Sequence, residues 1–93
     1  MTDSLQYSAD GPILVAGGYG TVGSALTALL APDFPLLLTG RTPERGDELA
    51  GRHGASVRRW DLLDPTPFDA SVRAVVSTVN DPHDRVLSAA VEA

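Results

Sequence analysis

Three glycines with a fixed spacing, Gly18, Gly20 and Gly23, form the pattern of this sequence that most directly predicts chemistry. They make a G-x-G-x-x-G motif, in which missing side chains permit a tight turn and let backbone N–H groups approach a phosphate. Gly17 adds the related spacing G-x-x-G-x-x-G. The motif predicts a diphosphate site. The candidate contacts in the turn are Gly18, Tyr19, Gly20, Thr21, Val22 and Gly23.

The glycine motif lies where a strand is expected to pass into a helix. The apolar run 13–16 predicts a strand buried on both faces. After the glycines, apolar residues recur at helical spacing, which predicts a helix with this stripe towards the core, ending before Pro32. The stripe consists of Val22, Ala25, Leu26, Leu29 and Leu30. The N-terminus of such a helix favours an anion, so this context predicts the pyrophosphate of a dinucleotide there.

The segment after the second apolar run, 36–39, bears on the choice of dinucleotide. Domains that bind NAD place Asp or Glu about 20 residues beyond the glycine motif, to hold the ribose 2′-hydroxyl. Here that place holds Arg41 and Thr42 without a carboxylate. A guanidinium pairs with a 2′-phosphate, and Thr42 can donate a further hydrogen bond, so we expect NADP as the cofactor. The alternatives are that Arg41 is a solvated surface residue or that Glu44 competes for it.

The remaining sequence continues the alternation of strands and helices. Four strands are predicted, at 13–16, 36–39, 56–60 and 74–79. A second helix is predicted from Thr42 and Pro43 to about His53, with Gly54 beyond its end. A short helical or turn segment including Phe68 is expected before the fourth strand, and a last helix is expected after Asp81.

This order of elements predicts an α/β fold, a partial Rossmann domain. Its parallel four-stranded sheet has the order 3-2-1-4 and is flanked by helices. Residues 1–11 are expected to be a disordered lead-in. Residues 12–93 are expected to be the N-terminal part of a dinucleotide-binding Rossmann domain, without a substrate domain.

Polar residues at the ends of the third and fourth strands are further candidates for cofactor contacts. Asp61 lies where such folds contact adenine, although it is equally suited to cap a turn. Thr78 and Asn80 end the fourth strand beside the point where the strand order reverses, near the expected nicotinamide ribose. Asn80 is alternatively a turn residue. Trp60 and Phe68 are expected in the core.

The runs Ile13–Gly23 and Leu38–Glu44, with Asp61 after the third strand, resemble the NADP-binding domain of the saccharopine dehydrogenase-like reductases. Val79 and Asn80, followed by 86–93, are similar to that family's fourth strand and next helix, so the likeness spans residues 12–93. It implies an oxidoreductase of amino-acid or related secondary metabolism that uses NADP(H) for imine or carbonyl chemistry. It also implies that a substrate and dimerisation domain follows, so no catalytic residue is carried over.

The composition narrows the function classes. The formal net charge of −5 argues against nucleic acid or anionic lipid as a partner. The chain has no cysteine, which excludes disulfides and thiolate catalysis within it, and no metal site is expected. All 7 basic residues are arginine, so a P-loop and a Tyr-x-x-x-Lys pair are excluded from this segment. No apolar run is long enough for a membrane span, and we expect a cytoplasmic protein.

The sequence leaves other functions open. One alternative is a non-catalytic dinucleotide-sensing module, and another is an atypical short-chain reductase or epimerase, whose glycine spacing Gly17 also satisfies. The segment by itself is expected to bind cofactor and not to catalyse. Because the apolar strand 74–79 would lie at the edge of the sheet, we expect either a homo-oligomer or pairing with a further C-terminal part of the protein.

Overall fold

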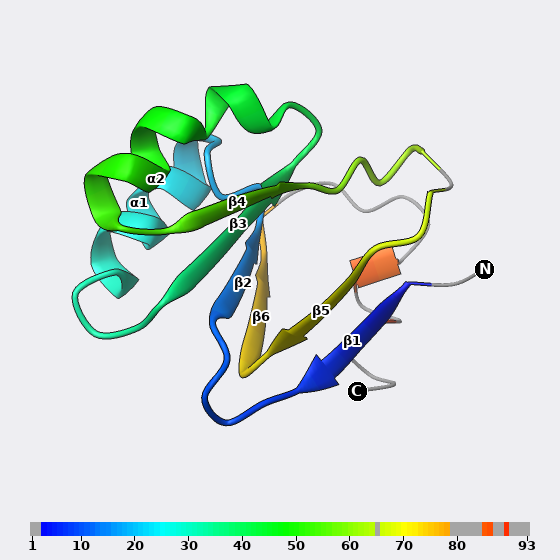
Figure 1. The fold of residues 1–93 in the computed structure, drawn as a ribbon. Coiled ribbons are helices and arrows are strands. Elements are labelled where there is room, and N and C mark those ends of the chain that lie inside the picture. Colours follow the sequence, from blue (N-terminus) through cyan, green and yellow to red (C-terminus); the bar gives the residue numbers. More distant parts are fainter. Residues whose placement is uncertain (1–2, 65, 79–84, 87–88, 90–93) are drawn as a thin grey trace.

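The structure is a computed structural model, and it describes residues 3–64, 66–78, 85–86 and 89 (Figure 1). It contains six strands, two α-helices and a short 3-10 helix in its described part. In chain order these elements are β1 (Ser4–Tyr7), β2 (Ile13–Ala16), α1 (Thr21–Leu30), β3 (Leu36–Gly40), η1 (Pro43–Arg45), α2 (Asp47–His53), β4 (Ser56–Arg59), β5 (Asp69–Val72) and β6 (Ala74–Ser77). None of the helices in these residues has the length and hydropathy that a membrane span needs.

The four predicted strands form one parallel sheet in the order β4-β3-β2-β6. Counted among the four predicted strands, this is the expected order 3-2-1-4, so the α/β class and its parallel sheet are confirmed. In the described residues, β6 pairs with β2 alone and forms one edge of this sheet. Figure 1 shows α1 and α2 together on one face of the sheet, while β1 and β5 lie on the other side.

Alternate residues of the central strands face two separate hydrophobic clusters. Ile13, Val15 and Leu38 belong to the cluster on the helix face, together with Ala50 of α2. Leu14 and Leu37 belong to the cluster on the opposite face. The sequence reads as continuous apolar runs because both faces of these strands are covered, as expected for a parallel sheet.

Helix α1 packs through a face that only partly coincides with the predicted stripe: Leu26 and Leu30 are half-buried, and Leu30 packs against the cluster on the helix face. Thr27 is fully buried, and its hydroxyl donates to the carbonyl of Gly23 at 2.8 Å. Gly23 is buried too, whereas Val22 and Leu29 of the predicted core stripe are 61% and 71% exposed. A buried threonine is tolerated here because the helix carbonyl satisfies its hydroxyl. The glycine then lets this side of the helix approach the sheet closely.

A two-stranded parallel sheet of β1 and β5 is a feature that the sequence analysis missed. Residues 4–7 are therefore a strand and not part of a disordered lead-in, and Phe68 precedes a strand rather than lying in a helical segment. Only Leu5 of β1 is buried, so this strand shows little alternation in sequence. Arg73, between β5 and β6, donates to the carbonyls of Ala9 and Gly11 at 2.7 and 3.2 Å.

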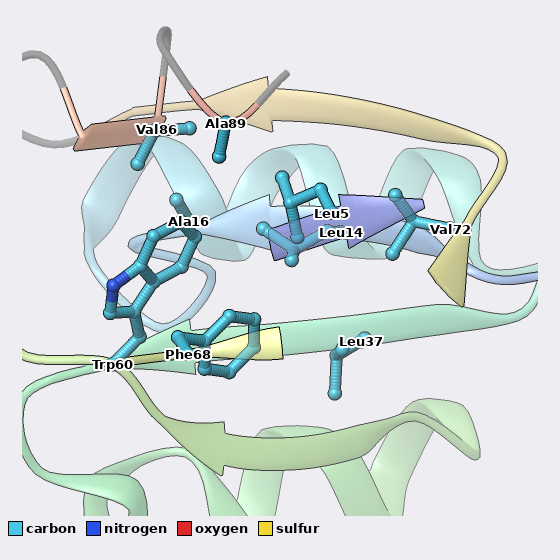
Figure 2. Packing of buried hydrophobic residues seen from close by; sticks show 9 residues of the cluster. All are labelled: Leu5, Leu14, Ala16, Leu37, Trp60, Phe68, Val72, Val86 and Ala89. Atoms are coloured by element: carbon cyan, nitrogen blue, oxygen red, sulfur yellow. The ribbon is translucent and has the colours of Figure 1, made fainter. Parts of the chain in front are cut away.

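The β1–β5 pair covers the face of the main sheet opposite the helices (Figure 2). Leu5 and Val72 lie beside Leu14 in this cluster. Trp60 and Phe68 stack there with ring centroids 4.4 Å apart and an interplanar angle of 5°, which confirms their expected place in the core. Much of the predicted last helix lies outside the described residues, although residues 85, 86 and 89 are helical.

The helix predicted from Pro43 to His53 is divided into η1 and α2 at Gly46. Pro43 opens η1 as expected, although the Thr42 side chain makes no capping hydrogen bond. Gly54 ends α2 with a φ of 66°, a left-handed conformation that glycine adopts without strain, as the sequence predicts.

Candidate functional site

The candidate residues gather at the carboxyl ends of β2, β3 and β6. Because these neighbouring strands are parallel, the loops that follow them leave the sheet at the same edge. The chain proceeds from β2 to β3 on one side and later enters β6 on the other, so the strand order reverses between β2 and β6. Ligands of open α/β sheets bind outside such a reversal point.

The glycine turn is closed by the protein's own backbone. Gly17 has a φ of 83°, and its N–H donates to the carbonyl of Thr39 at 2.7 Å. The N–H of Gly20 donates back to the Gly17 carbonyl at 3.1 Å. The turn is therefore fixed to the end of β3 before any ligand arrives, with glycine at the position whose positive φ requires it.

Packing within the protein explains why two of the three motif positions are glycine, but not the third. A Cβ on Gly23 would lie 2.0 Å from the Gly17 oxygen, and one on Gly18 would lie 2.8 Å from Cδ2 of Leu38. These two glycines are required by the packing of helix, turn and strand. A Cβ on Gly20 would meet nothing closer than the Gly17 oxygen at 3.5 Å, and the φ of Gly20 is −78°. The described protein residues therefore leave room for a side chain at Gly20.

The N-terminus of α1 is exposed and uncapped. Gly20 is the N-cap residue, no side chain caps the helix, and its first turn holds no acidic residue. Thr21 and Val22, at the first two helical positions, are exposed. The first N–H groups of a helix have no partner within it, and the helix dipole adds partial positive charge there. An anion that reached Gly20 would meet these donors.

Tyr19 joins the glycine turn to the segment after β3. Its hydroxyl oxygen accepts a hydrogen bond from the backbone N–H of Thr42 at 3.1 Å. Burial raises the pKa of Tyr19, against the opposing effect of this hydrogen bond, so the phenol is neutral at pH 7. The Arg41–Thr42 segment is thereby held next to the turn.

The Arg41 side chain is exposed and makes no ion pair with any described residue. In particular, the nearby Glu44 does not compete for it. A guanidinium has five N–H donors and is always charged, so Arg41 offers a complete set of donors to a ligand. This arrangement is compatible with both the phosphate-binding and the solvated interpretation of Arg41.

The remaining candidates take protein contacts at the same edge. Asp61 accepts a hydrogen bond from the Leu63 N–H at 3.0 Å and pairs with Arg59 at 3.4 Å, which is the geometry of the turn interpretation. The Thr78 hydroxyl lies 2.9 Å from the Ala16 carbonyl, to which it donates, and so joins the ends of β6 and β2. Asn80 lies outside the described residues.

Sequence reasoning missed two residues that shape this site. The hydroxyl of Thr27 in α1 also lies within hydrogen-bonding distance of the glycine turn, 3.3 Å from the Gly18 carbonyl oxygen. Gly46 provides room for the ring of Tyr19, because a Cβ there would lie 2.5 Å from Cδ1 of the ring. A polar residue four positions after the last glycine of the motif was the available signal for Thr27; no local pattern points to Gly46.

Within the described part of the chain, no group of His, Cys, Asp and Glu side chains is arranged to hold a metal ion. Comparisons of the chain with protein-family models, with curated proteins and with solved structures found no match.

Proposed function

We propose that this chain is the NADP(H)-binding part of an oxidoreductase similar to the saccharopine dehydrogenase-like reductases. The observation that carries the proposal is the free space in front of Gly20. Neither its φ of −78° nor any close contact requires glycine there. Ser, Asp or Asn would cap the helix somewhat better than glycine does, and the open space at this N-cap lets a ligand approach the backbone, which supports the proposal.

A pyrophosphate is the ligand group that fits these surroundings. The exposed first turn of α1 offers backbone N–H donors and the positive end of the helix dipole, without a carboxylate to repel an anion. The turn lies beside the reversal of strand order, where a dinucleotide can extend to both sides. A ligand with a single phosphate group would bind here equally well. The assignment of the ligand as NADP(H) therefore depends on Arg41.

Arg41 supports a 2′-phosphate on the adenosine ribose. It follows directly after β3, at the place where NAD-binding domains carry an acidic residue, and its donors are not used by other described residues. A carboxylate would repel the 2′-phosphate, whereas a guanidinium binds it with charge-assisted hydrogen bonds. In this proposal the chain binds and orients NADP(H), and the bound nicotinamide supplies hydride transfer.

Substitution of Gly20 by valine tests the proposal. We expect Gly20→Val to fold with unchanged circular dichroism, because the side chain enters open space, and to bind NADPH at least about tenfold more weakly, because it occupies the space of the pyrophosphate. Titration of NADPH fluorescence measures the affinity.

Gly51→Val is the matched control, since a Cβ at Gly51 in α2 also meets nothing within 4 Å. It should leave NADPH affinity unchanged. Equal affinities of wild type, Gly20→Val and Gly51→Val would refute the assignment of the turn as the pyrophosphate site.

A further inference from the structure

The ring of Tyr19 lies against the two glycines on either side of the Arg41 segment. A Cβ on Gly40 would lie 2.3 Å from the Tyr19 hydroxyl oxygen and 2.4 Å from Cζ. A Cβ on Gly46 would lie 2.5 Å from Cδ1 of the same ring. The ring therefore touches the chain immediately before Arg41 and again where η1 passes into α2.

The backbone gives no separate reason for glycine at these two positions. Gly46 has φ and ψ of −95° and −10°, in the right-handed helical region that any residue adopts. Gly40 is the last residue of β3 and is not among the described glycines with positive φ, which are Gly17 and Gly54. Both glycines are explained by the space that the Tyr19 ring occupies.

The Tyr19 hydroxyl adds a polar contact to this packing. It accepts the N–H of Thr42, the residue that follows Arg41, at 3.1 Å. Tyr19 itself stands between Gly18 and Gly20 in the phosphate-binding turn. One side chain thus connects the proposed pyrophosphate site with the backbone that carries Arg41, and Thr42 is exposed, so water competes for its N–H when the phenol is absent.

We infer that Tyr19 is a positioning residue that holds Arg41 and Thr42 at a fixed place relative to the glycine turn and thereby sets the preference for a 2′-phosphorylated dinucleotide. This inference rests on the proposed function. Its physical basis is preorganisation: a loop already held in its binding conformation loses less conformational entropy when the 2′-phosphate binds. NADH has no 2′-phosphate and does not benefit from the arrangement.

The first test removes only the hydroxyl. We expect Tyr19→Phe to keep the ring packing and the fold, and to bind NADPH roughly three- to tenfold more weakly, the range that one neutral hydrogen bond supplies. Its affinity for NADH should stay within about twofold of wild type, because NADH has no 2′-phosphate and its binding does not depend on this hydrogen bond. A residue with only a structural role would weaken both cofactors together, so the NADPH to NADH affinity ratio is the decisive readout.

The second test uses the glycine beneath the ring. Gly46→Ala should displace the ring and lower the NADPH to NADH affinity ratio in wild type, but should have no further effect in Tyr19→Ala, where the contact is absent. Gly51→Ala is the control, because its methyl group meets nothing within 4 Å, and it should leave the ratio unchanged in both backgrounds.

The outcomes separate this inference from the proposed function. A wild-type chain that binds neither NADPH nor NADH would overturn both. A wild-type chain that prefers NADPH, with an unchanged ratio in Tyr19→Phe or with independent effects of Gly46→Ala and Tyr19→Ala, would overturn the role of Tyr19 alone. A reduced ratio in Tyr19→Phe and a non-additive pair would support it.

Discussion

Arg41 and Arg85 occupy opposite kinds of surroundings in the same small molecule. The Arg85 side chain is 15% exposed and pairs with Asp3, whose side chain is 11% exposed, at 2.8 Å. It also donates to the carbonyls of Asp61, Asp64 and Thr66. Arg41 is exposed and pairs with no described residue.

The two sets of surroundings distinguish an arginine with a structural role from one whose donors are available to a ligand. Arg85 connects Asp3, which precedes β1, with the carbonyls of Asp61, Asp64 and Thr66, and these acceptors occupy the N–H groups of its guanidinium. Such an arginine holds a fold together. An exposed arginine without a described protein partner contributes little to stability, so Arg41 is available for the ligand that we propose.

Removal of the Arg85 side chain should have the largest effect on stability. We expect Arg85→Ala to lower the free energy of unfolding by roughly 3 kcal/mol, because it leaves the Asp3 carboxylate and several carbonyls without their partner in a mostly buried place. Arg41→Ala should change it by less than about 0.5 kcal/mol. Urea unfolding followed by circular dichroism measures both.

Arg52→Ala is a control for the loss of an arginine as such. It removes an exposed ion pair with Glu48 at 2.8 Å within α2, which is worth about 0.3–0.5 kcal/mol. If Arg85→Ala cost no more than Arg52→Ala, the contrast between a structural and an available arginine would fail.

Acid should weaken the Arg85 region. The hydrogen bond from Arg85 holds the pKa of Asp3 below its usual value, with help from the Phe68 N–H and against the effect of burial. A carboxyl with a lowered folded pKa stabilises the protein above its unfolded pKa, near 4, and this contribution is lost as the pH falls through the folded value. The melting temperature should therefore drop below about pH 4.

The pH dependence can be assigned with two variants. Asp3→Asn should melt at a lower temperature than wild type at pH 6 and should lose less stability between pH 5 and pH 3, because one linked carboxyl is gone. Asp10→Asn, at an exposed position, is the control for the loss of one carboxylate as such. Part of the wild-type slope belongs to Asp64, whose pKa is lowered by hydrogen bonds from Thr66. Identical slopes in all three proteins would contradict the role given to Asp3.

The main sheet was predictable because its signals are local. Buried runs such as 13–16 and 36–38 are apolar on both faces, and the glycines, Pro32 and Gly54 mark the turns between elements. The order of the strands then follows from the Rossmann topology that the glycine motif indicates. The glycine turn of the candidate site was predicted in the same way, since its residues are contiguous.

The missed features depend on contacts between distant residues. β1 pairs with β5, whose residues lie 65 positions later in the sequence. Only one side chain of β1 is buried, so its sequence lacks the apolar alternation that indicates a strand. The buried face of α1 contains Gly23 and Thr27, which hydropathy does not favour, because close approach and a satisfied hydroxyl outweigh apolar area there. The Tyr19 contact with Gly46 likewise has no local pattern.

The central claim is that Arg41 provides a site for the 2′-phosphate of a dinucleotide bound on the glycine turn. Parallel titrations of the wild-type chain and Arg41→Ala with NADPH and NADH test it most directly. One charge-assisted contact is worth about 1.5–3 kcal/mol, so wild type should bind NADPH roughly ten- to a hundredfold more tightly than NADH. Arg41→Ala should lose most of this difference and bind NADH as before. Equal affinities of the wild-type chain for the two cofactors, or no binding of either, would contradict the account.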